Sequence, residues 1–342
     1  MFKRIIPLLI FLSFLNAQIA LPTFQAFQKP QSTAISSLSL FDFTTHTFTN
    51  CGQTGHTGPS LSTCKTWYQT NSNGTSSAWR DNADYFNMEV NGIQLWTVPA
   101  DGTYRIEVWG AQGVLVTTDG NWQAGGELEG GGGKGARMRG DFDLNQGEKI
   151  KILVGQMGRG EYAASGGGGG TFVAKYDNTA LIVAGGGGGN RRNNNFNTAM
   201  NAVTSTSGAD ASNVSDTGGS GGNGGTSGSY SGSGAGFTGD GVKSSDSRSM
   251  HLKTKASSFI NGGVGGQLQY STAHSYMQGG FGGGGAGGWG GTGAGGGYSG
   301  GGGGTNSNSS YAGGGGSYNN GSNQSNEGGL WESHGKCTIT KQ

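Results

Sequence analysis

The chain of 342 residues contains 75 glycines and only 32% of its residues are hydrophobic, so a conventional core can be built from only part of it. Its formal net charge is +1 and it has no basic cluster, which argues against nucleic acid as a partner. Collagen is excluded, because the Gly-X-Y period is missing and all 5 prolines precede the glycine tracts.

The N-terminus has the pattern of a secretory signal peptide, residues 1–17. Lys3 and Arg4 precede an apolar segment, residues 5–15, and a cleavage site follows. This segment is too short to cross a bilayer, and no later segment reaches the roughly 20 apolar residues that a spanning helix needs. We therefore expect a secreted, extracellular or cell-surface-associated protein without a membrane span. Residues 18–39 are polar and aperiodic, and they are expected to form an N-terminal arm or linker.

Short segments with alternating apolar and polar residues begin at residue 40. In residues 104–108, for example, apolar side chains alternate with Arg105 and Glu107, which is typical of a strand with one solvated face. Strands are predicted on this basis at residues 40–48, 93–98, 104–108, 136–141, 149–154, 171–176, 180–184 and 336–341.

The strands predict an all-β fold. No stretch has a convincing helical period, and short strands with polar outer faces are typical of an antiparallel β-sandwich or jelly roll. We expect residues 40–184 and 335–341 to form this sandwich. His46 is expected to lie on it as a surface or interface residue.

The cysteines predict one disulfide. Cys51 and Cys64 lie close together in a turn-rich loop, residues 50–78, and are the natural pair in an exported protein. Cys337 lies on the last predicted strand, where a free cysteine packs as a small hydrophobic residue. An intermolecular disulfide through Cys337 is the alternative.

The glycine-rich region, residues 185–334, requires a different kind of packing. Glycine loses the most backbone entropy on ordering and buries no side chain, so such a region is either a disordered spacer or a place where the backbone itself packs. Polyglycine II helices have about three residues per turn and no internal hydrogen bonds, so neighbouring helices can bond to one another. Aromatic residues such as Phe281 and Tyr298 interrupt the runs, and a strand follows them. We therefore expect a large inserted bundle of polyglycine II helices.

Three segments resemble a known extracellular module. They are FTNCGQTGHTGPSLSTCKTWY (residues 48–68), GIQLWTVPADGTYRIEVWGAQG (92–113) and HGKCTITK (334–341). Together with the glycine runs, they are similar to the glycine-rich module of the anaplastic lymphoma kinase and leukocyte tyrosine kinase receptors and of related secreted glycine-rich proteins. The resemblance covers residues 40–341 and implies a tumour-necrosis-factor-like (TNF-like) jelly-roll sandwich with an inserted polyglycine II bundle. It also implies protein–protein binding outside the cell. The sequence contains no kinase domain, so receptor signalling is not implied.

Polar loops with aromatic residues interrupt the glycine region at residues 190–217, 243–259 and 267–278. Loops on a rigid scaffold commonly carry recognition, so we predict binding residues in them. These are Arg191, Arg192, Phe196, Arg248, His251, Tyr270, His274 and Tyr276. The alternative is that the loops only connect the helices and keep the bundle soluble. Candidate N-glycosylation sites are Asn73, Asn213, Asn308, Asn320 and Asn323.

No pattern of catalytic residues is present. The 5 histidines are scattered without metal-ligand spacing, and we expect neither a metal nor a cofactor. Residues 297–301 match G-x-S-x-G, but no predicted strand precedes them and no helix follows. We therefore expect a secreted, non-enzymatic binding or adhesion protein, whose partner is an extracellular protein, a glycan surface or a copy of itself. The alternative is a structural subunit of an extracellular filament, coat or matrix.

Overall fold

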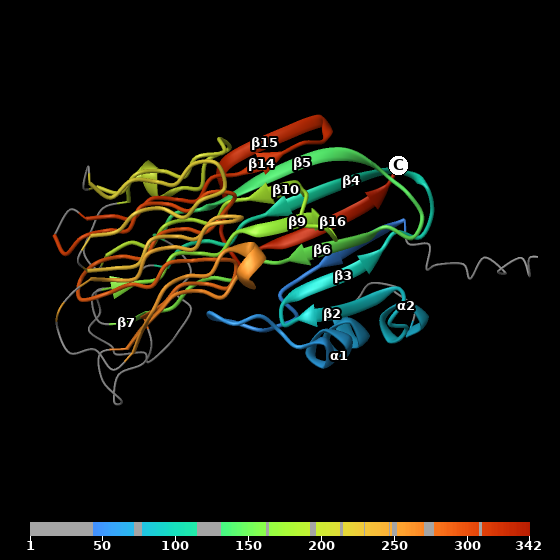
Figure 1. Cartoon of the computed structure of the whole chain (residues 1–342), viewed down its shortest axis with the longest axis horizontal. Coiled ribbons are helices and arrows are strands. Elements are labelled where there is room, and N and C mark those ends of the chain that lie inside the picture. Colours follow the sequence, from blue (N-terminus) through green and yellow to red (C-terminus); the bar gives the residue numbers. More distant parts are fainter. Residues whose placement is uncertain are drawn as a thin grey trace, which may run out of the picture. The chain divides into compact units, whose positions relative to one another are not determined.

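The computed structural model of the chain describes part of one compact unit, Ser39–Gln342 (Figure 1). The described residues are 44–71, 77–114, 131–161, 164–191, 196–212, 215–228, 230–245, 247, 252–269, 277–307 and 310–342. The predicted signal peptide and N-terminal arm therefore lie outside them. Within the described residues, no helix has the length and apolar character to cross a membrane.

Two antiparallel sheets form a sandwich-like core. The first sheet has five strands, in the spatial order β1 (Thr45–Phe48), β16 (Lys336–Lys341), β4 (Gly102–Trp109), β5 (Gly135–Leu144) and β15 (Ser322–Trp331). The second sheet has six, in the order β14 (Tyr318–Asn319), β10 (Ala180–Ala184), β9 (Thr171–Lys175), β6 (Lys149–Leu153), β3 (Ile93–Thr97) and β2 (Phe86–Val90). The all-β prediction is confirmed.

Alternation along the strands places the core between these sheets. Ile106 of β4 and Met138 of β5 face Trp96 of β3 and Ile152 of β6, and all four are buried in one hydrophobic cluster. The charged residues of β4 lie on the opposite face of the first sheet. Arg105 donates two hydrogen bonds to Asp141 of β5, at 2.8 and 2.9 Å. The alternation read from the sequence therefore holds in the fold: the apolar residues of these strands face the core, and the charged residues face away from it.

Two helices were not predicted from the sequence. Helix α1 (Leu61–Asn71) begins near the end of the loop between the two paired cysteines and contains Cys64, and α2 (Ser77–Asp81) follows it. Their local signal is weak, because α1 has only two buried residues, Cys64 and Tyr68. Its start has a cap that could have been recognised, since the Thr63 N–H donates to Ser60 Oγ at 3.2 Å.

His46 lies in the core and not at a surface or interface. Its side chain is 4% exposed and contacts the rings of Phe48, Tyr68 and Trp79. The physical reason is that α1 and α2 supply aromatic residues that cover β1, and the sequence pattern did not reveal these helices. Burial lowers the pKa of His46 to about 3, so the imidazole is neutral in the folded protein.

The C-terminal part of the chain closes the sandwich. β14 and β15 come from the range assigned to the glycine-rich bundle, yet they pair with β10 and β5. The sandwich therefore extends further into residues 185–334 than the sequence predicted. β15 was missed because it reads SNQSNEGGLW, which has few of the branched and aromatic residues typical of strands.

Cysteine chemistry in the fold agrees with the sequence. A disulfide joins Cys51 to Cys64, as predicted. Cys337 is free and fully buried on β16, opposite Val108 of β4. Its position supports the interpretation as a small core residue over the intermolecular disulfide, and burial raises the pKa of its thiol.

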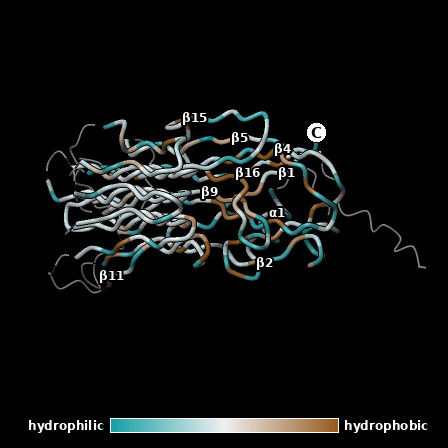
Figure 2. Tube along the Cα trace, turned by 45° about the horizontal axis from the view of Figure 1, so that its top comes forward, coloured by the Kyte–Doolittle hydropathy of each residue, from teal (hydrophilic) through white to brown (hydrophobic). Residues whose placement is uncertain are grey.

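Outside the two main sheets, the described part of residues 160–334 contains only short regular elements. They are β7 (Gly160–Glu161), β8 (Ala164–Ser165), β11 (Leu252–Thr254), β12 (Gln267–Gln269), β13 (Met277–Gln278) and the short 3₁₀ turns Thr198–Met200 and Phe259–Asn261. β7 pairs with β8, and β12 lies between β11 and β13. Most of the region runs as extended segments side by side, which are pale in Figure 2 because glycine is neither strongly hydrophilic nor hydrophobic.

Candidate functional site

The glycine segments are joined by main-chain hydrogen bonds whose partner repeats every third residue. In residues 166–170, the N–H of Gly167 donates to the carbonyl of Gly285 at 3.1 Å. Three residues later, the N–H of Gly170 donates to Gly282 of the same neighbouring segment at 2.8 Å. The partner numbers fall as the donor numbers rise, so these two segments run antiparallel.

A second segment, residues 185–190, follows the same rule. Gly186 donates to Gly296 at 2.7 Å, and Gly189 donates to Gly293 of the same neighbour at 2.8 Å. Its other donors to main-chain carbonyls are Gly187 to Ala111, Gly188 to Met200 and Asn190 to Val114. The segment therefore bonds to three neighbours in turn, and it returns to two of them, residues 293–296 and 111–114, after three residues.

Little space separates these backbones. A Cβ atom added at Gly295 would lie under 3.0 Å from the carbonyl oxygen of Gly186, and one added at Gly302 would lie as close to the carbonyl oxygen of Asp216. Real Cβ atoms essentially never approach other atoms so closely. The packing of these segments therefore requires residues without side chains.

Aromatic residues attach the glycine region to the outer face of the second sheet. Phe172 of β9 stacks on Phe259 with ring centroids 5.2 Å apart, and Phe259 stacks on Phe237 at 4.9 Å. Phe281 belongs to the same buried cluster. Tyr298 stacks on Tyr318 of β14 at 4.6 Å. The aromatic residues that interrupt the glycine runs therefore anchor them.

Two of the predicted binding residues lie within the described residues. Arg191 is half-buried, and its Nη1 donates to Asn306 Oδ1 at 2.9 Å. Phe196 exposes 46% of its surface. Arg191 thus has a structural contact between two glycine segments, whereas Phe196 is available to a partner. The remaining predictions lie outside the described residues: Arg192, Arg248, His251, Tyr270, His274 and Tyr276.

Two candidate glycosylation sites are described, and they differ. Asn320 is exposed, and its backbone N–H donates to the carbonyl of Leu181. Asn323 uses its side-chain nitrogen to donate to Asp141 Oδ2 at 3.0 Å, so a glycan on this nitrogen would disturb that bond. Asn320 is therefore the better acceptor of the two. Asn73, Asn213 and Asn308 lie outside the described residues.

Among the described residues, no three His, Cys, Asp or Glu side chains are grouped so that they could hold a metal ion. Burial opposes ionisation of Asp240, yet Lys255, the Ser258 N–H and Asn261 outweigh it and hold the pKa of Asp240 below its usual range. This carboxylate therefore fastens a loop of the glycine region. No protein-family model matches the sequence.

One feature of the surface was missed in the sequence. A depression beside the disulfide is lined mainly by α1, which the strand-based interpretation treated as a loop. Two features of the sequence could have indicated helix α1. One is Ser60, which caps its start, and the other is the recurrence of Thr and Ser at helical spacing in residues 62–70.

Proposed function

We propose that the chain is a secreted, non-enzymatic binding or adhesion protein. In this proposal a TNF-like jelly-roll sandwich carries a bundle of polyglycine II helices, and the bundle holds recognition loops in place. The observation that carries the proposal is that a glycine segment returns to the same hydrogen-bonded neighbour after three residues, as Gly186 and Gly189 do with Gly296 and Gly293. A helix with about three residues per turn presents the same side to a neighbour at this interval.

The close approach of the segments supports a rigid role. A flexible spacer would gain nothing from glycines at which a Cβ would overlap with a neighbouring carbonyl, as at Gly295 and Gly302, whereas a bundle joined by amides requires them. Rigid supports lower the entropy that a loop loses when it binds a partner. The exposed ring of Phe196 lies on one such loop, in residues 190–217.

The location and partner follow from the same reasoning. The disulfide between Cys51 and Cys64 fits an oxidising compartment, which supports export. The resemblance to the receptor module supports binding outside the cell. We expect the partner to be an extracellular protein, a glycan surface or another copy of the chain.

The test compares two matched double variants. The first replaces Arg192 and Phe196 by Ser, which removes one cation and one aromatic ring from a loop and leaves the bond between Arg191 and Asn306 in place. The second replaces Lys151 and Tyr176 by Ser, which removes the same kinds of group from the sandwich, where Lys151 Nζ lies 5.0 Å from the Tyr176 ring centroid. Binding of labelled protein is measured on cells of the organism that produces it and on an immobilised layer of the protein itself.

We expect saturable binding of the unchanged protein, a loss of at least about tenfold in the first variant and no change in the second. Absence of saturable binding, or an equal loss in both variants, would overturn the proposal. Binding only to the protein layer, together with growth of assemblies in light scattering, would favour the filament, coat or matrix subunit.

A further inference from the structure

A depression on the sandwich is lined by none of the loop residues on which the proposed function rests. Its volume is about 540 Å³, which is within the range of small-molecule sites. One face of α1 forms most of its wall, because residues spaced by four along a helix share a side. The lining residues are Cys51, Ser62, Thr63, Thr66, Trp67, Thr70 and Asn71.

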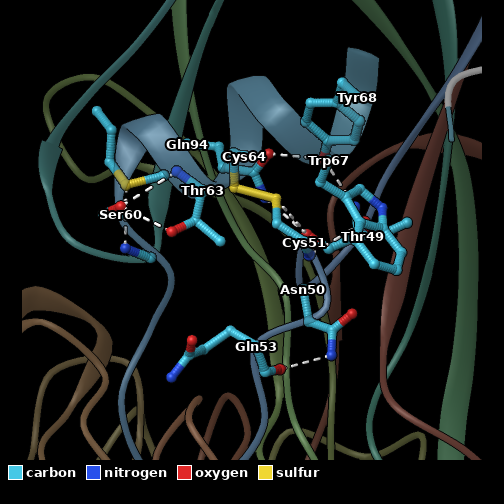
Figure 3. The surroundings of a disulfide bond; sticks show 12 residues. Thr49, Asn50, Cys51, Gln53, Ser60, Thr63, Cys64, Trp67, Tyr68 and Gln94 are labelled. Atoms are coloured by element: carbon cyan, nitrogen blue, oxygen red, sulfur yellow. Dashed lines mark hydrogen bonds between the residues drawn. A yellow bond between two sulfur atoms is a disulfide. The ribbon is translucent and has the colours of Figure 1, made fainter. Parts of the chain in front are cut away.

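The wall of this depression is held firmly. The disulfide fixes Cys64 of α1 to Cys51, and Figure 3 shows both beside Thr63 and Trp67. Tyr68, on the inner side of the helix, donates from its hydroxyl to Gln94 Oε1 at 2.8 Å and accepts from the Thr49 N–H at 2.9 Å. The helix therefore cannot shift easily, and the groups on its outer side keep their spacing.

Trp67 is positioned by a special backbone conformation. Gly52 has a φ of +71°, and a Cβ at this residue would lie under 3.0 Å from the Trp67 ring. The half-buried indole therefore lies against bare backbone on one side. An indole fixed in this way offers a flat apolar surface without losing side-chain entropy when a ligand binds.

The chemistry of the lining is polar and uncharged. Apart from Cys51 and Trp67, the lining side chains carry hydroxyl or amide groups, and none carries a charge. Ser62 and Thr63 share one partner, Ser60 Oγ, at 2.9 and 2.8 Å, so each hydroxyl retains capacity for another bond. Without a cation or a carboxylate in the wall, the depression offers an anionic or cationic ligand no countercharge.

We propose that this depression binds a neutral saccharide. A sugar ring presents hydroxyls, which match the Ser, Thr and Asn side chains, and an apolar C–H face, which matches the Trp67 indole. The volume accommodates one or two sugar rings. The site does not depend on the polyglycine bundle or on the loops, so it can fail while the proposed function holds.

The experiment uses the full chain, produced in an oxidising bacterial compartment so that the disulfide forms and Asn73 carries no glycan. Probes are soluble oligomers of glucose, mannose and N-acetylglucosamine, with a heparin oligosaccharide as the charged comparison, and binding is measured by titration calorimetry. The variant Thr66→Arg places a long cation in the depression. The control Gln69→Arg makes the same kind of change on an exposed residue of α1 that does not line it.

We expect at least one neutral oligomer to bind, Thr66→Arg to weaken that binding at least tenfold, and Gln69→Arg to leave it within twofold. Trp67→Phe keeps a ring on the helix and should weaken the same binding several-fold while the thermal midpoint confirms a folded protein. The proposal is overturned if no neutral oligomer binds, if heparin alone binds, or if the two arginine variants behave alike.

Discussion

The sandwich and the glycine region hold neighbouring segments of chain together in opposite ways. In the sandwich, strands bury apolar side chains, as with Ile106 of β4 and Ile152 of β6, and the backbone bonds follow from the pairing. In the glycine region, the N–H of Gly186 donates to the carbonyl of Gly296. A Cβ added at the adjacent Gly295 would overlap with the carbonyl oxygen of Gly186. There the main chain supplies both the contact surface and the hydrogen bonds.

This difference determines which kind of substitution destabilises each region. Removing methyl groups from a side-chain core leaves a cavity, whereas adding a methyl group to a backbone-packed region forces segments apart. The two regions meet at aromatic residues such as Phe281, whose ring lies against the turn at Gly92 between β2 and β3. Gly92 has a φ of +85°, and a Cβ there would overlap with the Phe281 ring.

The largest effect is expected from side chains added to the glycine region. Gly295→Val and Gly302→Val each place a branched side chain against a carbonyl oxygen, so we expect a loss of more than about 4 kcal/mol or no folded protein. The measurement is the urea midpoint by circular dichroism. Gly147→Asn is the control, because Gly147 has a φ of +84°, which Asn tolerates, and nothing within 4 Å of an added Cβ. Normal stability of the two Val variants would show that the segments do not pack through their backbones.

The next largest effect is expected where the two regions meet. Phe281→Ala removes a fully buried ring, and we expect it to lower the free energy of unfolding by about 3–5 kcal/mol. Phe196→Ala, at a ring that is 46% exposed, should change it by less than about 0.5 kcal/mol. Amide exchange should then reveal which region loosens first. Equal stability of these two variants would mean that the aromatic residues do not anchor the glycine region.

Removing the disulfide tests the sandwich alone. The double variant Cys51→Ala, Cys64→Ala opens a link with a sequence separation of 13. We expect the free energy of unfolding to fall by about 3 kcal/mol, because the unfolded chain regains the entropy that the link removed.

The unchanged protein should run as a monomer on a non-reducing gel, since Cys337 is buried. A dimer that disappears on reduction would instead support the intermolecular disulfide.

The smallest effect is expected from pH and comes from the core of the sandwich. The pKa of His46 is lowered to about 3 by burial, so the unfolded chain takes up the proton first as pH falls below the ordinary value of about 6.5. Above that pH, protonation of His46 therefore does not affect the stability of the fold. We expect the free energy of unfolding to fall by about 2 kcal/mol between pH 7 and pH 5.

The variant His46→Phe isolates this contribution. It should flatten the dependence of unfolding free energy on pH between 7 and 5. A residual slope of the same sign is expected from His56, whose pKa burial also lowers, with Gln278 opposing and Arg159 adding to the shift. If His46→Phe kept the full slope, the neutral buried histidine would not be its source.

Strands with an apolar or an alternating pattern were predictable, whereas strands without such a pattern, such as β15, were not. The predictions at residues 180–184 and 336–341 coincide with β10 and β16, because local pattern and burial agree there. β15 has no such pattern and exists because β5 offers an edge for pairing. α1 likewise depends on the disulfide and on Tyr68, which are contacts with distant residues.

The candidate sites also differ in whether the sequence alone could reveal them. The loop containing Phe196 could be named from composition, because polar and aromatic residues interrupt a glycine background. The depression beside the disulfide could not, because Thr66 and Trp67 share a wall only once α1 has formed. Arg191 was predicted as a binding residue, and that stays a prediction; only the fold shows that its guanidinium is bonded to Asn306.

By itself, the sequence determined the all-β class and the pairing of Cys51 with Cys64, because these depend on residue type and local spacing. The tertiary structure decided which glycine segment lies beside which. Gly186 and Gly296 are far apart in the chain, and glycines carry no side chain that could encode the choice of neighbour. The aromatic anchors on the second sheet and the main-chain bonds make that choice together, and they exist only in the folded protein.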